Sequence, residues 1–530
     1  MGILAVYDTV GIQDFIFSSN KLAENVGASK LVADVFCLEG GPLPQVIESV
    51  TKKSPTAWGV NDKLNPELKA EVVYQGGGNS FVAFDSEEIF QEVTKKFLVE
   101  VRKKAPGIGI AVAAVETDFK DTYKSDYQSL MSRLALTKGK FNIPVFAGNQ
   151  PITKQSERTA LPVSSFDTVF KKEPKEYMSI DQLAKRNSYE EYLKKEYLKK
   201  ENANNPEEGS VIRNFNGLAF DKDKDSLIAI IHADGNNMGN RIIEYMKDVN
   251  SYDEAVPKMR RMSERISKCY KKAFNTTVEA FKKQHNSYLD LLQMNINSPE
   301  EVPMPLIELI NDGDDITVVI CGRFAIDFAA RLLREIEKIE KEESPFENLE
   351  DPQLTACAGV VIYHCHYPFS EAYKLAESLC KSAKEPSRTS NGKGSYIDFQ
   401  LHTSGNIASL EQLRGRQYEV GGKSILRRPW RVSSGIEDEY PNFKLFEEDM
   451  KIIKAPNMPK GKLKALKNAI SISNGAAEEA GNQISELNLL QTIKQEKEKA
   501  GSNSIYVPLF DMLELCDNYE NLLNTEGSNL

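Results

Sequence analysis

One order of structural elements is indicated twice along this 530-residue chain, and it constrains the fold more than any other feature. Each copy reads as a strand that breaks at an aspartate, a hairpin, a buried strand and a helix that ends at a lysine. The first copy comprises the segments 3–16, 72–84, 107–117 and 125–138. The second comprises 228–240, 306–320, 354–364 and 369–384. Two copies of one α+β module with an antiparallel sheet explain this order. The alternative is two unrelated domains that share a common order of elements.

The length of the chain predicts roughly three domains, since domains usually run about 100–200 residues. The region between the copies is polar and includes a charged helical run at 189–209, which is typical of a solvated helix and linker. From residue 443 onward the apolar periodicity is helical. The predicted limits are a first module at 1–150, a linker at 151–222, a second module at 223–402, and a basic loop with a helical domain at 403–530.

Composition excludes several classes of protein. No run of about 18 apolar residues and no signal-peptide pattern occurs, so we expect a soluble cytoplasmic chain without a membrane partner. The seven cysteines are scattered without a CxxC pair, and no structural zinc site is predicted. A net charge of −10 argues against a protein that coats nucleic acid by itself, although a local basic groove or basic partners could still bring RNA to it.

The second hairpin carries the strongest chemical signal. Asp314 and Asp315 lie at its tip beside Gly313, where two adjacent acids repel unless a cation neutralises them. Asp234, at the end of the upstream strand, would complete an oxygen cage of the kind that Mg²⁺ takes when it also holds substrate phosphates. That arrangement is the one found in palm-type polymerases and nucleotide cyclases. The alternative is a solvated, Asp-rich turn.

An ordered set of motifs gives a family resemblance over nearly the whole chain. The motifs are VGIQDFIFSSNKLAENVGAS, YQGGGNSF, HADGNNMG, DGDDI, AGVVIYHCHYPFSEAYKLAESLCKSAK, SYIDFQLH, RRPWRV and VPLFDMLELCDNY. The chain resembles the large palm-containing subunit of type III CRISPR effector complexes. The resemblance implies two ferredoxin-like palm domains of the GGDEF/cyclase type that bind two ATP molecules. It also implies that the palm with the acid pair joins them into cyclic oligoadenylates, in a complex whose other subunits carry crRNA.

The chain departs from the family pattern in three ways. Asp312 replaces the first glycine of the usual Gly-Gly-Asp-Asp hairpin, and its side chain could crowd a metal or point outward. The chain begins directly with the first palm, and none of its five histidines is followed by Asp, so the HD nuclease domain of many members is not expected. No cysteine lies between Cys37 and Cys269, so the zinc-binding cysteines common between the palms are missing.

The proposed chemistry is attack of a ribose 3′-hydroxyl on an α-phosphate, with Asp234, Asp314 and Asp315 holding Mg²⁺ or Mn²⁺. The backbone amides of 235–239 could cradle a triphosphate, and Gly235 and Gly239 would permit that approach. Three further side chains have two interpretations each. Asn236 and Asn237 would contact phosphate or ribose, or cap the helix. Lys384 resembles the triphosphate lysine of cyclase palms, or is a surface charge at a helix end.

The first hairpin has no carboxylate and should bind the acceptor nucleotide without metal. Its predicted nucleotide-binding residues are Gly76, Gly77, Gly78 and Asn79. A plain glycine-rich hairpin is the alternative. The basic and aromatic stretch at 414–431 could contact RNA or a partner subunit, or form a solvated loop.

Three functional hypotheses follow. The first is an ATP-using cyclic oligoadenylate synthase, within a type III complex or standing alone. The second is a GGDEF-like enzyme that makes a cyclic dinucleotide from GTP, which tandem palms in one chain disfavour. The third is a scaffold that binds nucleotide without turnover. Because interfaces between domains of one chain are often modest and mobile, we also expect a partner assembly to stimulate synthesis by fixing the palms.

Overall fold

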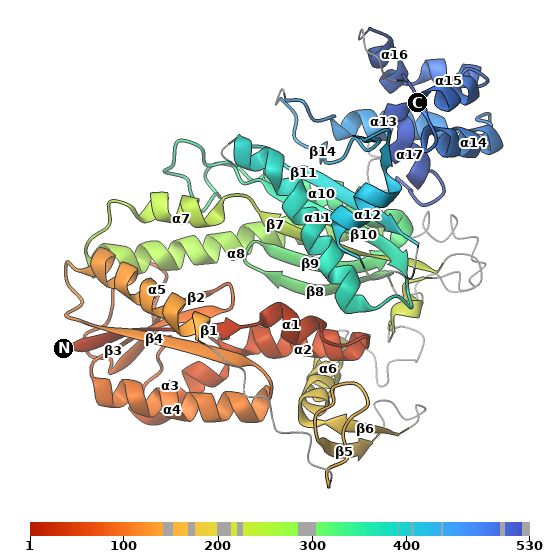
Figure 1. Cartoon of the computed structure of the whole chain (residues 1–530). Coiled ribbons are helices and arrows are strands. Elements are labelled where there is room, and N and C mark those ends of the chain that lie inside the picture. Colours follow the sequence, from red (N-terminus) through yellow and green to blue (C-terminus); the bar gives the residue numbers. More distant parts are fainter. Residues whose placement is uncertain are drawn as a thin grey trace.

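The computed structural model describes most of the chain (Figure 1). The described residues are 1–140, 152–167, 175–198, 212, 214–219, 226–284, 304–390, 392–403, 405, 408–435, 438–498 and 504–521. They form two separate α+β units and a set of C-terminal helices, as the fold class predicted from the sequence requires. No helix within these ranges is long and apolar enough to cross a bilayer.

The first unit is a four-stranded antiparallel sheet in the order β2-β3-β1-β4. Side chains of β1 alternate between two buried clusters, so both faces of the sheet are covered. Helices α3 and α4 cover one face, and α5 covers the other. The elements are β1 (Gly2–Val10), α1 (Ile12–Phe17), α2 (Leu22–Val35), α3 (Pro42–Thr51), β2 (Ala70–Gly76), β3 (Asn79–Phe84), α4 (Glu87–Lys104), β4 (Gly109–Thr117) and α5 (Tyr123–Gly139).

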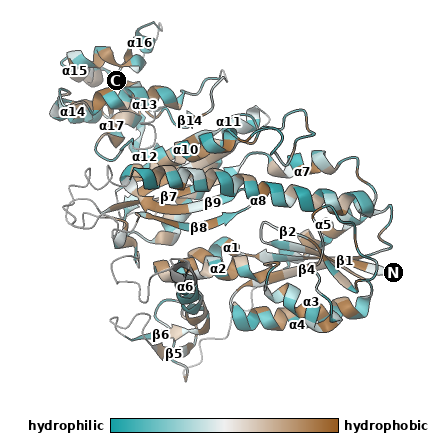
Figure 2. Cartoon of the chain, turned by 180° about the vertical axis from the view of Figure 1, so that it is seen from behind, coloured by the Kyte–Doolittle hydropathy of each residue, from teal (hydrophilic) through white to brown (hydrophobic). Residues whose placement is uncertain are grey.

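The second unit repeats that order and extends it. Its sheet runs β14-β11-β10-β7-β9-β8, so β8-β9-β7-β10 has the strand order of β2-β3-β1-β4. The continuous apolar character of β7 and β9 reflects burial on both faces (Figure 2). Helix α11 covers one face, and α8 and α10 cover the other. The elements are β7 (Leu227–Gly235), α7 (Met238–Met246), α8 (Tyr252–Lys283), β8 (Leu306–Asp312), β9 (Asp315–Cys321), α10 (Ala325–Glu337), β10 (Ala356–His364), α11 (Phe369–Thr389), β11 (Tyr396–His402) and β14 (Trp430–Arg431).

The two units share buried cores through two helices that each span both units. Residues near the start of α2 pack in a cluster with the second sheet, whereas Val35 at its end packs with the first. Helix α8 does the reverse, with Met259 in a cluster with the first sheet and Ile266 in the core of the second. Arg260 of α8 donates to Glu71 of β2 at 2.6 Å, and both side chains are almost fully buried. The interface is therefore extensive, and the prediction of a modest one is wrong.

The region between the units is partly described. A two-stranded sheet, β5 (Val163–Asp167) and β6 (Glu176–Ser179), leads into helix α6 (Ile180–Leu198). Residues 199–209 of the predicted charged run lie outside the described residues. Arg186 of α6 forms an ion pair with the buried Glu24 of α2 at 2.9 Å, so this region is anchored to the first unit. The predicted domain limits at 150, 222 and 402 remain predictions.

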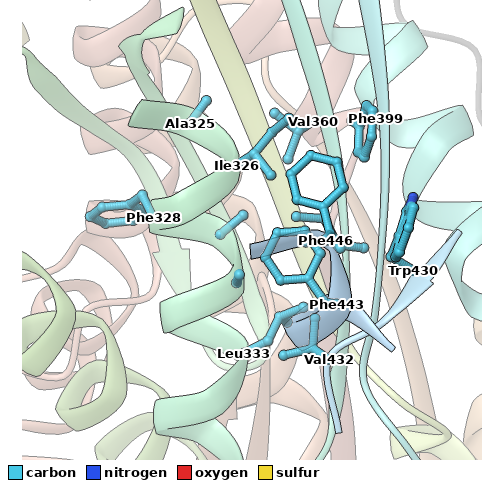
Figure 3. Close-up of a cluster of buried hydrophobic side chains, with 14 of the residues drawn as sticks. Ala325, Ile326, Phe328, Leu333, Val360, Phe399, Trp430, Val432, Phe443 and Phe446 are labelled. Atoms are coloured by element: carbon cyan, nitrogen blue, oxygen red, sulfur yellow. The ribbon is translucent and has the colours of Figure 1, made fainter. Parts of the chain in front are cut away.

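The C-terminal region is helical, as its periodicity predicted, apart from a short hairpin of β12 (Glu419–Val420) and β13 (Lys423–Ser424). Phe443 and Phe446 of α13 pack in one cluster with Trp430 and Phe399 of the second sheet (Figure 3). This aromatic contact fixes the helices to the edge of the second unit. The helices are α12 (Leu410–Gln417), α13 (Phe443–Ile453), α14 (Lys460–Ile470), α15 (Asn474–Gly481), α16 (Gln491–Glu498) and α17 (Phe510–Leu515).

Candidate nucleotide and metal site

The predicted acids meet at one end of the second sheet. Asp234 of β7 pairs with Asp315 of β9, and Asp315 pairs in turn with Asp312 of β8. Gly313 supplies the left-handed residue of the turn, with φ of 62°. A side chain at Gly235 would put its Cβ 2.6 Å from the Tyr270 hydroxyl and 2.9 Å from Asp314 Oδ2. Gly235 is therefore required because Asp314 lies directly against the backbone there.

Burial and neighbouring negative charges disfavour the charged form of the carboxyl groups of the acid hairpin. Burial, with the neighbouring Asp234 charge, raises the pKa of Asp314 to about 7. The same two causes, together with Asp314, raise the pKa of Asp315 to about 8. The Asp315 side chain still keeps 35% of its surface exposed, so the acids lie in a deep site that water and ions reach. Such a site favours a bound cation over two charged carboxylates alone.

The side chains of His232 and Thr317, which lie beside Asp315, carry no charge at neutral pH. Burial lowers the pKa of His232, whose Nδ1 lies 3.1 Å from Thr317 Oγ1 and 3.4 Å from Asp315 Oδ1. Asp315 Oδ1 is buried and has no hydrogen-bond partner. An unsatisfied buried carboxylate oxygen beside neutral groups is a site where a cation would be favourable.

Lys384 contacts the acids from α11. Its Nζ donates to Asp234 Oδ2 at 2.6 Å and to the Gly235 carbonyl oxygen at 2.8 Å. Burial alone would lower the pKa of Lys384, but the charge of Asp234 and their hydrogen bond raise it. The helix continues to Thr389, so Lys384 is neither at a helix end nor a free surface charge.

The fit to a metal ion is partial. Within the described residues, no three acids, histidines or cysteines are arranged so that all could hold one ion. Asp314 and Asp315 nevertheless offer oxygen donors, one of them unpaired, which is the ligand type that Mg²⁺ and Mn²⁺ take. Asp234 is the third candidate, and Lys384 already binds one of its oxygens.

The turn at 235–239 lines a pocket of about 570 Å³ beside the acids. Asn236 is buried and donates through Nδ2 to Thr355 Oγ1 and to the Gly394 carbonyl, so it holds the turn in place. Its backbone amide donates to the Thr355 carbonyl and is not free for phosphate. Asn237 makes no side-chain capping bond and accepts from Asn240 instead. Asn237 is thus the N-cap residue of α7 by position, but neither asparagine side chain caps the helix with a hydrogen bond.

Three further residues that line this pocket bear on its function, two of them predicted from the sequence and one not. Lys384 and Gly239 line it, although no described atom lies within 4 Å of a Cβ at Gly239. Arg388 also lines it, is exposed, and forms no ion pair among the described residues. Sequence reasoning missed Arg388, although its position four residues after Lys384 on one helix places both cations on the same face.

The first hairpin lies across a second pocket from the acids. Gly76, Gly77 and Asn79 line this pocket of about 840 Å³, together with Asp312 and Asp314. Gly77 and Gly78 have φ of 60° and 76°, and a Cβ at Gly78 would lie 2.5 Å from Ile12 Cδ1 and 2.7 Å from Thr9 Oγ1. Gly78 does not line the pocket and is required by packing.

Asp312 points toward the first unit. The surrounding protein raises the pKa of its carboxyl group, while the Lys271 charge and a hydrogen bond from the Gly78 backbone favour the charged form. The substituted acid therefore faces the glycine hairpin across the interface, although it keeps contact with solvent.

The two pockets meet at the acid hairpin. Both the 570 Å³ pocket and the 840 Å³ pocket are lined by Asp314 and Met238. One pocket belongs to the second unit, and the other lies between the units. Two ligands bound in them would therefore come together beside Asp314.

Part of the basic stretch at 414–431 is internal, although Arg416 and Lys423 are exposed. Arg414 forms an ion pair with Asp398 at 2.6 Å, and Arg428 forms one with Glu514 at 2.7 Å. Trp430 donates to the buried Asp511 at 2.9 Å. These groups join the sheet to the C-terminal helices, so the interpretations as an RNA surface and as a solvated loop are both wrong for them.

Comparison with known proteins identifies the second unit. The family described as Cas10/Cmr2, second palm domain, matches residues 227–392. This segment is similar to the second palm domain of Cas10/Cmr2. The resemblance to the palm subunit of type III CRISPR complexes is thereby confirmed. We refer below to the first unit as the first palm. A search of curated proteins found no match.

Solved structures show the same fold over the whole chain. A Csm1–Csm4 cassette in complex with cA4 is similar with a TM-score of 0.53 and 12% identity, covering 97% of this chain and 69% of that one. The cassette in complex with AMPPNP gives 0.51 at 13% identity, covering 98% and 69%. Csm1 of T. onnurineus gives 0.52 at 12% identity, with the same coverage of 98% and 69%. At these identities the likeness establishes the fold.

Proposed function

We propose that this chain is a nucleotidyltransferase subunit of type III CRISPR antiviral defence that makes cyclic oligoadenylate from ATP. The observation that carries the proposal is the meeting of two pockets at Asp314, because joining two nucleotides needs two binding sites that share one reactive centre. The matched structures with cA4 and AMPPNP make adenosine nucleotides the first choice of substrate. Their Csm4 partner supports a complex with a related subunit. That complex would carry crRNA and work in the cytoplasm.

The donor ATP would bind in the pocket of the second palm. Lys384 and Arg388, which both line this pocket, supply two positive charges for its triphosphate. Asp314 and Asp315, with Asp234, would hold Mg²⁺ or Mn²⁺. When bound, the metal supplies charge neutralisation at the attacking and leaving oxygens.

The acceptor nucleotide would bind in the pocket between the palms. Gly76, Gly77 and Asn79 offer a flat surface without carboxylates, which suits a nucleotide that need only present its 3′-hydroxyl. The first palm would therefore position its nucleotide without holding a metal. Pyrophosphate would leave toward Lys384 and Arg388.

The decisive experiment is product identification. The purified full chain, alone and in complexes from its host, is incubated with each NTP and Mg²⁺ or Mn²⁺, and products are identified by mass. We expect pyrophosphate release and 3′–5′ linked adenylates with ATP only. A cyclic dinucleotide from GTP would favour the GGDEF-like alternative. Nucleotide binding without product from any NTP, in the chain or in its complexes, would favour the scaffold.

A further inference from the structure

We propose that Lys384 controls the binding of the divalent cation, because it occupies Asp234 until a nucleotide triphosphate draws its ammonium group away. The inference rests on the proposed function and goes beyond a phosphate-binding role for this lysine. It predicts that removing Lys384 strengthens metal binding in the absence of nucleotide, which a purely phosphate-binding residue would not do.

The starting contact is short and sheltered. Lys384 Nζ is 2.6 Å from Asp234 Oδ2, and the Lys384 side chain is only 16% exposed. A second bond to the Gly235 carbonyl fixes the ammonium group over the turn. Asp314 lies within hydrogen-bonding reach of Asp234, so the ammonium group lies at the edge of the acid cluster.

A divalent cation and this ammonium group compete for one carboxylate. Two positive charges on the same oxygen atoms repel each other, so the ammonium group of Lys384 weakens the binding of a divalent cation at Asp234. Lys384 also lines the donor pocket with Arg388. A bound triphosphate therefore offers the ammonium group several negative oxygens on that side.

Transfer of the ammonium group from Asp234 to the triphosphate would couple the two binding events. The nucleotide gains an ion pair, and the metal gains the carboxylate that the lysine has left. Each ligand should therefore strengthen the binding of the other by the same factor. The device would keep the site free of metal until a donor nucleotide is present.

The first palm contains an internal control. Lys138 Nζ lies 2.7 Å from Asp8 Oδ1, in the equivalent place on α5 and β1. The hairpin positions equivalent to Asp314 and Asp315 are Gly78 and Asn79, which offer no carboxylate. Removing Lys138 should therefore free one carboxylate without creating a metal site.

The test is Mn²⁺ binding to the full-length chain, measured by calorimetry without nucleotide. Lys384→Met should bind Mn²⁺ about tenfold more tightly than the unmodified chain, because the competing charge is gone. Lys138→Met and the exposed Lys381→Met, whose lysine pairs only with Glu377 among the described residues, should leave Mn²⁺ affinity unchanged. With AMPPNP added, the affinity of the unmodified chain should rise by a larger factor than that of Lys384→Met.

Lys384→Gln serves as a second variant, and thermal melting verifies that each variant folds. Unchanged or weaker Mn²⁺ binding by both folded variants would overturn the inference. So would an equal gain from AMPPNP with and without Lys384. The binding measurement needs no turnover, so its failure is separate from failure of the proposed function, which is decided by the products formed from ATP.

Discussion

The two palms share a strand order and differ at three of the four hairpin positions, where Gly76, Gly78 and Asn79 stand in place of Asp312, Asp314 and Asp315. Both have the same strand order and the same aspartate–lysine ion pair, Asp8 with Lys138 and Asp234 with Lys384. The second palm adds Asp314 at its hairpin, where the first has Gly78. The ion pair therefore does not need the acid hairpin. Among the acids around the two hairpins, the pKa is raised at Asp312, Asp314 and Asp315 in the second palm and at Asp8 in the first.

The difference between Gly78 and Asp314 at the hairpin is accompanied by a second difference on the neighbouring strand. In the first palm Thr9 follows Asp8, and its hydroxyl donates to the Gly78 carbonyl at 2.7 Å. In the second palm Gly235 follows Asp234 and leaves the space that Asp314 occupies. In the first palm the side chain is on the strand (Thr9) and the glycine is on the hairpin (Gly78). In the second palm the glycine is on the strand (Gly235) and the side chain is on the hairpin (Asp314). One palm can therefore hold an acid at the hairpin tip, and the other has no room for one.

The largest expected effect is on adenylate synthesis, when the carboxylates of Asp314 and Asp315 are removed from the second palm. Asp314→Asn with Asp315→Asn should lower adenylate synthesis by about 10³-fold, because metal ligation supplies several kcal/mol of transition-state stabilisation. Pyrophosphate release measures it. The exposed pair Asp118→Asn with Asp121→Asn, in a turn of the first palm, is the control and should retain activity. Full activity of the Asp314 and Asp315 variant would place the site elsewhere.

A second prediction concerns stability where the C-terminal helices join β11 and β14, two strands that the first palm lacks. Arg428 and its partners Glu514 and Asp511 are nearly or fully buried where the C-terminal helices meet β11. Arg428→Ala should lower the free energy of unfolding by about 3–5 kcal/mol, because it leaves buried carboxylates without a counter-charge. Urea denaturation measures the loss. The exposed Arg416→Ala should change stability by less than about 0.5 kcal/mol. Equal effects from the two variants would contradict the assignment of Arg428 as a buried anchor.

A third prediction separates backbone strain from packing in the first hairpin. Gly77→Ala should cost about 1–2 kcal/mol, since its φ of 60° disfavours a Cβ but no described atom lies within 4 Å of it. Gly78→Ala should cost about 1–3 kcal/mol more, because its Cβ would clash with Ile12 and Thr9. The two denaturation midpoints are compared directly. Equal losses would show that Gly78 is required only for its backbone conformation.

The last prediction is a pH dependence of stability that arises at the acid hairpin of the second palm. The folded-state pKa values of about 7 for Asp314 and about 8 for Asp315 lie above the ordinary value of 3.8. The folded protein therefore binds more protons than the unfolded chain, and stability present below about pH 4 is lost as pH rises through 7 and 8. In EDTA, the melting temperature should fall over this window. The Asp314→Asn, Asp315→Asn variant should fall less, and an identical fall would contradict the pKa values.

The sequence predicted the arrangement of the fold well, because apolar periodicity and turn residues are local signals. The order of strands and helices, the hairpin tips at Gly77 and Gly313, and the helical C-terminus all followed from them. The predicted site included Asp234, the acid hairpin, the turn at 235–239 and Lys384, which line one pocket or its edge, but not Arg388. The role of Asn236 as a support of the turn depends on Thr355 and Gly394, which no sequence pattern connects to it.

The sequence by itself determined that one hairpin carries acids and the other glycines, since those residues are fixed by position whatever surrounds them. Only the tertiary structure decided their setting. Lys384 reaches Asp234 across 150 residues, Asp312 faces the first palm, and Arg414 and Arg428 form ion pairs with carboxylates that are nearly or fully buried. The physical reason is that burial and charge pairing depend on distant segments, whose approach is set by packing of the two cores.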